Sequence, residues 1–218
     1  MKLTRQVVVT TVVVIVIVAV FAVLVTRQLA SEPEAKGTGE RAAIATRPDS
    51  HRLDTADDSA VTLVEFTDFE CPSCRAAEPF VEQLRQKYAG RVTFVIRYFP
   101  LDIHPHAREA AHAVEAAARQ GRFEEMHDRM FATQDEWSGS SQSPAAQFRT
   151  FAEELGLDLR TYDADVAGDE VAARVQADVD DGLTLGVSGT PTFLLNGETI
   201  DAETADEFVQ RIDDALAG

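Results

Sequence analysis

The longest hydrophobic run lies near the amino terminus, at residues 7–25, and none of its 19 positions is charged. A helix of that length, rising about 1.5 Å per residue, is about 30 Å long and matches the hydrocarbon core of a bilayer. Lys2 and Arg5 precede the run, whereas Arg27 after it is soon followed by acidic residues. We therefore predict a single transmembrane helix, with residues 1–6 in the cytoplasm and the remainder outside.

A cleaved signal peptide is the competing interpretation of this run, since its charged start looks the same. Signal peptides usually have a hydrophobic region of about 7–15 residues that ends at a small-x-small cleavage site. Here the run is longer, and Gln28-Leu29-Ala30 places a bulky polar residue where a small one is needed. An uncleaved anchor is favoured, so we expect the protein at the cell membrane, with the bulk of the chain on the extracytoplasmic side.

A polar segment separates the predicted anchor from the part of the chain that is predicted to fold. From residue 31 to about residue 58 it is rich in Glu, Ala, Gly, Thr and Pro, with too few apolar residues to bury a core. We predict a flexible tether over residues 26–58 and one folded domain over residues 59–218, beginning near Val61. That length is enough for one domain with a substantial core.

Hydrophobic periodicity predicts a βαβ unit at the start of the folded domain. Residues 61–67 and 91–97 are short, apolar and rich in β-branched and aromatic side chains, which is typical of buried strands. Between them, apolar residues from Ala77 to Tyr88 recur every three or four positions, which predicts a helix. Short connections make a right-handed parallel unit the expected arrangement.

The end of the chain predicts a ββα unit. Residues 189–200 contain two short apolar runs around Asn196-Gly197, a strong hairpin signal, and residues 203–217 form an amphipathic helix. Helical periodicity dominates the sequence between the two units, over about residues 102–186. The predicted class is therefore α/β, with a helical insert between a βαβ half and a ββα half.

Charge and cysteine content exclude several functional classes. The chain has 37 acidic and 20 basic residues, a net charge of −17, and every acidic residue follows Arg27. Such a negative field repels phosphate backbones, so nucleic acid is not an expected partner. Two cysteines, Cys71 and Cys74, are too few for a disulfide scaffold and allow one bridge or one reactive pair.

The two cysteines form a Cys71-Pro72-Ser73-Cys74 motif where the first predicted strand ends and the helix begins. At a helix N-terminus, unpaired backbone N–H groups and the positive end of the helix dipole stabilise a thiolate on the first cysteine. Pro72 suits the first helical turn, where its missing N–H costs nothing. The position of the motif therefore favours a redox-active dithiol.

Two other interpretations of the motif stay open. A structural disulfide with this spacing would cross-link almost no chain and so restrict the unfolded state little. A zinc site needs about four ligands, and the remaining candidates are His104 and His106. We expect these histidines and Asp68 to be structural rather than catalytic, and we expect neither a metal nor a cofactor.

From about Val61 to Gly218 the sequence resembles the membrane-anchored DsbA-like thiol-disulfide oxidoreductases. Three segments carry the resemblance: residues 64–74 with the cysteine motif, residues 97–107, and Thr190-Pro191. The resemblance implies a thioredoxin-like fold with a helical insert over about residues 102–186, plus one N-terminal transmembrane helix.

The resemblance also implies roles for individual residues. Cys71 and Cys74 are the expected catalytic pair, with Pro191 beside them as a cis-proline. Glu65 is expected beneath the disulfide, exchanging protons with Cys74, although strand alternation in the sequence does not fix where Glu65 points. The expected substrate-binding residues surround the cysteines: Pro72, Ser73 and Thr190.

The implied activity is disulfide exchange with exported proteins. Related isomerases carry a separate dimerisation domain, for which the tether is too short, so a monomeric oxidase is favoured. Thr190 differs from the valine of the strongest oxidases, which keeps an isomerase or reductase as the alternative. A non-catalytic, metal-handling module of the same fold is a third interpretation. The expected partners are reduced or misfolded exported proteins and a quinone-linked membrane reoxidase.

Overall fold

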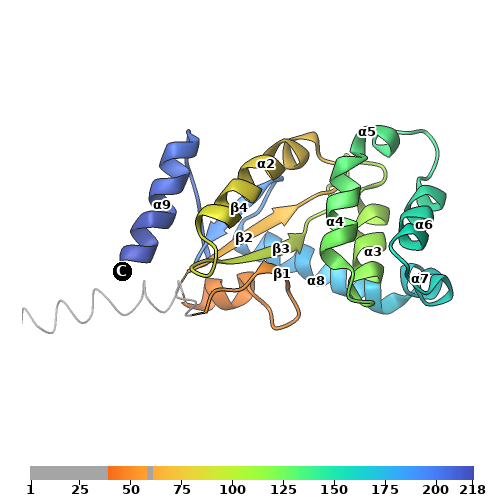
Figure 1. Cartoon of the computed structure of the whole chain (residues 1–218), viewed down its shortest axis with the longest axis horizontal. Helices are drawn as coiled ribbons and strands as arrows, with labels where there is room; N and C mark the ends of the chain where they lie inside the picture. Colours follow the sequence, from red (N-terminus) through yellow and green to blue (C-terminus); the bar gives the residue numbers. More distant parts are fainter. Residues whose placement is uncertain (1–38, 58–60) are drawn as a thin grey trace, which may run out of the picture. The chain divides into compact units, whose positions relative to one another are not determined.

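A mixed five-stranded sheet lies at the centre of the computed structural model, which describes residues 39–57 and 61–218 (Figure 1). The strand order is β1-β3-β2-β4-β5. Strands β2 and β3 pair in parallel, whereas β1 on β3, β4 on β2 and β5 on β4 are antiparallel. The strands are β1 (His51–Asp54), β2 (Thr62–Thr67), β3 (Thr93–Tyr98), β4 (Thr192–Leu195) and β5 (Glu198–Thr199).

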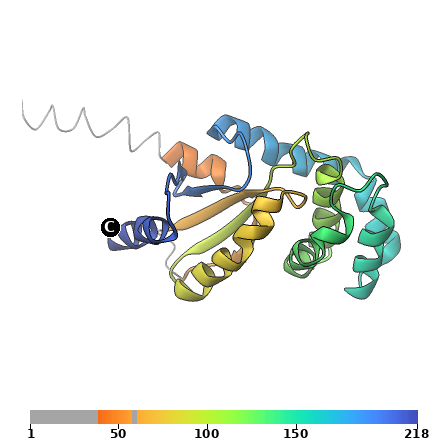
Figure 2. The same cartoon turned by 90° about the horizontal axis from the view of Figure 1, so that it is seen from above.

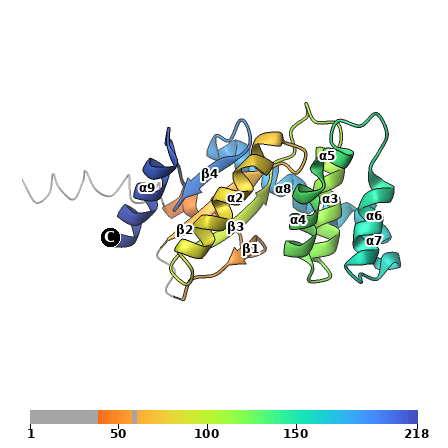
Figure 3. The same ribbon diagram turned by 45° about the horizontal axis from the view of Figure 1, so that its top comes forward.

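Helices connect the strands as the periodicity predicts. Helix α2 (Pro72–Lys87) joins β2 to the parallel strand β3, and α9 (Ala205–Ala217) follows the final hairpin. The insert lies between β3 and β4 and is entirely helical, with most of its helices gathered at one end of the sheet (Figure 3). Its helices are α3 (Ala107–Ala118), α4 (Phe123–Ala132), α5 (Gln134–Trp137), α6 (Ala145–Glu154), α7 (Leu159–Val166) and α8 (Asp169–Leu185).

Strand β2 has helices on both of its faces, α2 on one side and α8 on the other (Figure 2). Leu63 packs in a core with side chains of α2 and α9, whereas Val64 and Phe66 pack in a second core with the end of α8. Successive side chains of a strand point to opposite faces. Glu65 therefore points to the same face as Leu63, beneath α2.

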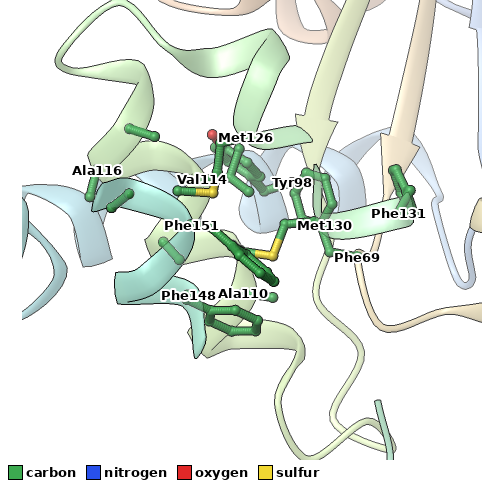
Figure 4. Close-up of a cluster of buried hydrophobic side chains, with 14 of the residues drawn as sticks. Phe69, Tyr98, Ala110, Val114, Ala116, Met126, Met130, Phe131, Phe148 and Phe151 are labelled. Carbon is green, nitrogen blue, oxygen red and sulfur yellow. The ribbon is translucent and has the colours of Figure 1, made fainter. Parts of the chain in front are cut away.

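A third core joins the insert to the ends of β2 and β3. Phe69, which follows β2, lies beside Met130 and Phe131 of α4, and its ring centroid is 5.1 Å from that of Phe131 (Figure 4). Tyr98 at the end of β3 belongs to the same cluster. Helix α3 supplies mainly alanines to this core, which lets neighbouring helices approach closely. The segment that leads into the cysteine motif is thus anchored in the insert.

The predicted hairpin is present and has the expected turn. Asn196 and Gly197 have φ values of 51° and 90°, as the central residues of a tight hairpin turn require. Gly197 is also constrained from outside the hairpin, because a Cβ there would lie 2.4 Å from the backbone nitrogen of Ala42.

Folded structure begins earlier than the expected tether allows. Residues 41–45 are helical, and β1 lies inside the predicted tether over residues 26–58 and forms the edge strand beside β3. The shortage of apolar residues was misleading because this segment needs only a few buried side chains and hydrogen bonds to hold it against the sheet. Ala45 and Leu53 are buried, and Arg97 donates hydrogen bonds to the carbonyls of Ile44 and Ala45.

The predicted cytoplasmic residues 1–6 and transmembrane helix at residues 7–25 lie outside the described residues. Within residues 39–57 and 61–218, no helix is both long enough and apolar enough to cross a membrane.

Candidate active site

Cys71 and Cys74 occupy the N-terminus of α2, as the sequence predicts. Cys71 is the N-cap residue, Pro72 begins the helix, and Cys74 lies in its first turn. Both residues carry free thiols. Cys71 is 6% exposed whereas Cys74 is fully buried, and the intervening Pro72 and Ser73 are exposed. Of the two cysteines, only Cys71 keeps any exposure to solvent.

The loop before β4 lies against Cys71. The Thr190-Pro191 peptide bond is cis, as the resemblance implies. The thiol of Cys71 donates a hydrogen bond to the carbonyl oxygen of Thr190 at 3.4 Å, although the two residues are 119 positions apart. The hydroxyl of Thr192 donates to the carbonyl of Gly189 at 2.7 Å and steadies the loop. The structure therefore brings the cysteine motif and Thr190-Pro191 into one site.

Glu65 lies in the protein interior behind the cysteine motif. It is 3% exposed, and neither carboxyl oxygen has a hydrogen-bond partner among the described residues. Burial raises the pKa of Glu65 to about 7. Burial also raises the pKa of the Cys74 thiol, and the nearby charge of Glu65 raises it further. An acid that titrates near neutral pH is thus close enough to Cys74 to influence its ionisation.

Glu78 is a second acid near the cysteines, half-buried, that no sequence motif singled out. It follows Cys74 by four residues and therefore lies on the same face of α2. Burial raises the pKa of Glu78 to about 7, and His127 of α4, with its Nε2 3.7 Å from the carboxyl group, opposes that shift. Glu78 also lines a groove of about 430 Å³ between α2 and α4. The four-residue spacing from Cys74 was the signal that could have identified it.

Asp68 and the two histidines have the structural roles expected of them. The carboxylate of Asp68 accepts hydrogen bonds from the backbone N–H groups of Glu70 and Leu101 and from Nδ1 of His104, at 2.8, 3.0 and 2.6 Å. Nε2 of His106 donates to the carbonyl of Ser140 at 2.8 Å. No group of three or more His, Cys, Asp or Glu side chains in the described part of the chain is placed to hold a metal ion.

Two further buried residues hold the turn that carries Cys71. The carboxylate of Glu70 accepts from the backbone N–H groups of His106 and Gly139, at 2.6 and 2.8 Å. The side-chain amide of Gln134, at the start of α5, donates to the carbonyls of Phe69 and Cys71, at 2.7 and 3.0 Å. Both are 2% exposed. No local sequence pattern indicates either residue, since their partners are distant along the chain.

Comparison with known proteins gives matches in both sequence and structure. A family model described as Thioredoxin matches residues 56–214. The chain is 46% identical over 151 residues to the Na(+)/H(+) antiporter NhaA 3 of Salinispora tropica, a match that covers 69% of this chain. The chain spans only 22% of the length of that relative.

Two solved structures share most of the fold. A thioredoxin-like oxidoreductase from Silicibacter pomeroyi DSS-3 is 28% identical with a TM-score of 0.65, and the match covers 81% of this chain and 97% of that one. Oxidised BdbD from Bacillus subtilis is 25% identical with a TM-score of 0.67, over 78% of this chain and 94% of that one.

Proposed function

Because this chain belongs to the thioredoxin family, with a DsbA-like arrangement of sheet and helical insert, we propose that it is a thiol-disulfide oxidoreductase that introduces disulfide bonds into exported proteins. One observation carries the proposal. Cys71, the less buried of the two cysteines, caps α2 beside the cis Thr190-Pro191 bond, while Cys74 is fully buried one turn into the helix.

The first step is attack by a substrate thiolate on Sγ of Cys71 in the oxidised enzyme. The Cys71–Cys74 bond breaks, a bond between the substrate sulfur and Cys71 forms, and Cys74 leaves as a thiolate. Exposure decides which sulfur is attacked, because Cys74 is fully buried.

A proton must reach Cys74 in this step, since burial disfavours its thiolate. Glu65 is suited to deliver that proton, because a carboxyl group whose pKa is about 7 is about half protonated at neutral pH and largely protonated in slightly acidic surroundings. During reoxidation the transfer runs in reverse, and Glu65 takes the proton from Cys74.

The second step completes the transfer of two electrons. A second substrate thiolate attacks the substrate sulfur of the mixed disulfide, so a substrate disulfide forms and Cys71 leaves as a thiolate. The unpaired N–H groups at the start of α2 stabilise this leaving thiolate. Two substrate thiols have then been oxidised and the two enzyme cysteines reduced.

Substrate binding is assigned to the surface around Cys71. Pro72 and Ser73 are exposed between the two cysteines, and the carbonyl of Thr190 already faces the Cys71 thiol. A peptide that occupies this position meets Pro191 from the same loop. An isomerase or reductase with the same site is the second candidate, supported by threonine at position 190.

The proposed setting is the extracytoplasmic side of the cell membrane. The uncharged run at residues 7–25 supports an anchor. Each catalytic cycle leaves the enzyme reduced, so a quinone-linked membrane partner is the proposed reoxidant. We propose that the protein works as a monomer on reduced or misfolded exported proteins.

Incubation of the oxidised full-length protein with a reduced, unfolded secretory protein tests the activity. We expect substrate thiols to disappear and Cys71→Ser to abolish the reaction. Cys74→Ser, whose Cys71 thiolate can attack a substrate disulfide, should accumulate a mixed disulfide through Cys71 when it is incubated with the oxidised form of the same substrate. Trapping the two cysteines in cells should find them mainly oxidised. Ready reduction of insulin, together with free thiols in cells, would instead establish a reductase.

A further inference from the structure

Two buried side chains connect the catalytic turn to the helical insert: the charged Glu70, which lies in the turn, and the neutral Gln134, which lies in the insert. We propose that Glu70 is a positioning residue whose carboxylate both ties the Cys71 turn to the insert and limits how strongly the enzyme oxidises its substrates. In this proposal Gln134 is the neutral second tie. The inference rests on the proposed redox function of Cys71.

The carboxylate of Glu70 connects the Cys71 turn to two separate segments of the insert. It immediately precedes Cys71, and its carboxylate accepts from the N–H groups of His106, before α3, and of Gly139, after α5. These two partners are neutral backbone groups rather than cations. They stabilise the carboxylate by hydrogen bonding but leave its negative charge in place.

The buried carboxylate that in this proposal acts against the helix N-terminus belongs to the residue directly before Cys71. The start of α2 favours a thiolate on Cys71, whereas the field of Glu70 disfavours it, and burial of Glu70 leaves that field only weakly screened by salt. In the oxidative reaction Cys71 is the leaving group, and a more stable thiolate makes the reduced enzyme more favourable. Glu70 therefore weakens the oxidising strength of the site.

Gln134 holds the same turn without adding charge. Its amide donates to carbonyls on both sides of Glu70, and one of them, that of Cys71, also accepts the first helical hydrogen bond, from Arg75 at 3.3 Å. It thereby fixes the backbone from which α2 begins. Substituting Gln134 with an apolar residue therefore gives a matched comparison, because it removes hydrogen bonds from the turn and leaves the charge of the turn unchanged.

Other titratable and charged groups also face the turn, and all of them remain in the variants below. Asp68 lies in the turn itself, and Glu65 and Cys74 lie in the interior behind it. His104 and His106 come from the segment after β3, and Glu109 comes from the first turn of α3. Arg75 of α2 and its ion-pair partner Asp135 of α5 complete the set.

The test compares variants of the full-length protein by two equilibrium measurements. One is the pH midpoint of the thiolate absorbance of the reduced enzyme, and the other is the redox equilibrium with glutathione. We expect Glu70→Gln to move the midpoint to lower pH and to shift the equilibrium about tenfold toward the reduced enzyme, which is about 30 mV. Gln134→Met should lower the free energy of unfolding without this shift.

Two more variants complete the design. Glu136→Gln removes an exposed charge from the same helix as Gln134 and should leave both equilibria unchanged. Gln134→Lys retains a donor for the two carbonyls and offsets the charge of Glu70, so it should shift both equilibria in the same direction as Glu70→Gln. If Glu70→Gln does not fold, Gln134→Lys tests the effect of the Glu70 charge in its place.

The outcomes separate this inference from the proposed function. An inactive wild-type protein would refute the redox function itself. An active wild type whose equilibria stay the same in Glu70→Gln, or move equally in Gln134→Met, would refute the role of the Glu70 charge. Where Glu70→Gln does not fold, unchanged equilibria in Gln134→Lys would refute it.

Discussion

Three buried acidic residues next to the cysteines differ in their hydrogen-bond partners, and the partners decide what each can do. Asp68 accepts three hydrogen bonds and Glu70 accepts two. Glu65 accepts none from the described residues, so burial dominates its ionisation. Hydrogen bonds stabilise a carboxylate, and burial without them favours the protonated form. Glu65 is therefore suited to carry a proton, whereas Asp68 and Glu70 hold the backbone.

Glu65 should make the stability of the fold depend on pH. Its folded-state pKa of about 7 exceeds the value of 4.5 for an unperturbed glutamate, so stability falls as the pH rises from 4.5 to 7. Glu65→Gln removes this titration. We expect it to raise the free energy of unfolding at pH 8 by about 2–3 kcal/mol and to change it little at pH 4.

Urea unfolding at the two pH values measures this difference. Glu153→Gln, at an exposed position of α6, is the control and should have no effect at either pH. An equal change at pH 4 and pH 8 in Glu65→Gln would show that packing, not ionisation, is responsible.

The sequence predicted those site residues that belong to a linear motif. Cys71 and Cys74 could be found from their residue types, spacing and position at the start of a helix, whereas the Thr190-Pro191 pair was implied only by the family resemblance. Glu70 and Gln134 could not be found, because their hydrogen-bond partners lie 36 to 69 positions away and no local pattern indicates them. The direction of the Glu65 side chain depends on which core each face of β2 contacts, and strand alternation in the sequence does not show this.

At the scale of elements, the contact between α8 and the sheet depends on one small residue. Gly182 is buried within α8, and a Cβ at this position would lie 2.8 Å from ring carbons of Phe99 and 3.1 Å from Phe66. Alanine normally favours a helix over glycine by about 1 kcal/mol. Here the ring contacts oppose that gain, because α8 would have to move away from the sheet.

We expect Gly182→Ala to lower the free energy of unfolding by about 1–2 kcal/mol, since overpacking usually costs about 1–3 kcal/mol. Thr184→Ala, two positions away at an exposed site of the same helix, should be neutral or slightly stabilising. Chemical denaturation of the two variants checks the prediction. A stabilised Gly182→Ala would contradict the tight approach of α8 to the sheet.

Element prediction succeeded where a period or a turn signal was long enough to detect. Helices α2 and α9 and the Asn196-Gly197 hairpin agree with the expected segments to within a few residues. The four-residue α5 is too short to show a helical period. Strand β1 was missed because its His-Arg-Leu-Asp sequence has one apolar residue, and pairing with β3 rather than hydrophobic pattern defines it.

At the scale of the whole molecule, a buried ionic cluster connects the start of the folded part to the insert. Arg97 on β3 is fully buried and pairs with Asp178 and Asp181 of α8, while Arg174 also pairs with Asp178. The guanidinium of Arg97 also donates hydrogen bonds to the carbonyls of Ile44 and Ala45. A buried charge that loses its partners is costly, so residues 41–57 belong to the cooperative unit.

Three fragments test where the cooperative unit begins: residues 39–218, 50–218 and 61–218. Removing residues 39–49 takes two acceptors from Arg97, and removing residues 50–60 as well exposes the edge of β3. An unpartnered buried donor costs about 1–3 kcal/mol, so we expect the free energy of unfolding to fall by about 2–5 kcal/mol at the first step and further at the second.

Urea unfolding followed by circular dichroism should place the fragments in that order, with the longest the most stable. Arg97→Met in the two longer fragments is the control, because without the guanidinium the loss of residues 39–49 should cost less. If the three fragments unfold at the same urea concentration, folded structure begins at residue 61, as the hydrophobic pattern alone suggests. A dependence on length that persists in Arg97→Met would instead assign the effect to backbone pairing of β1 and packing of residues 41–45.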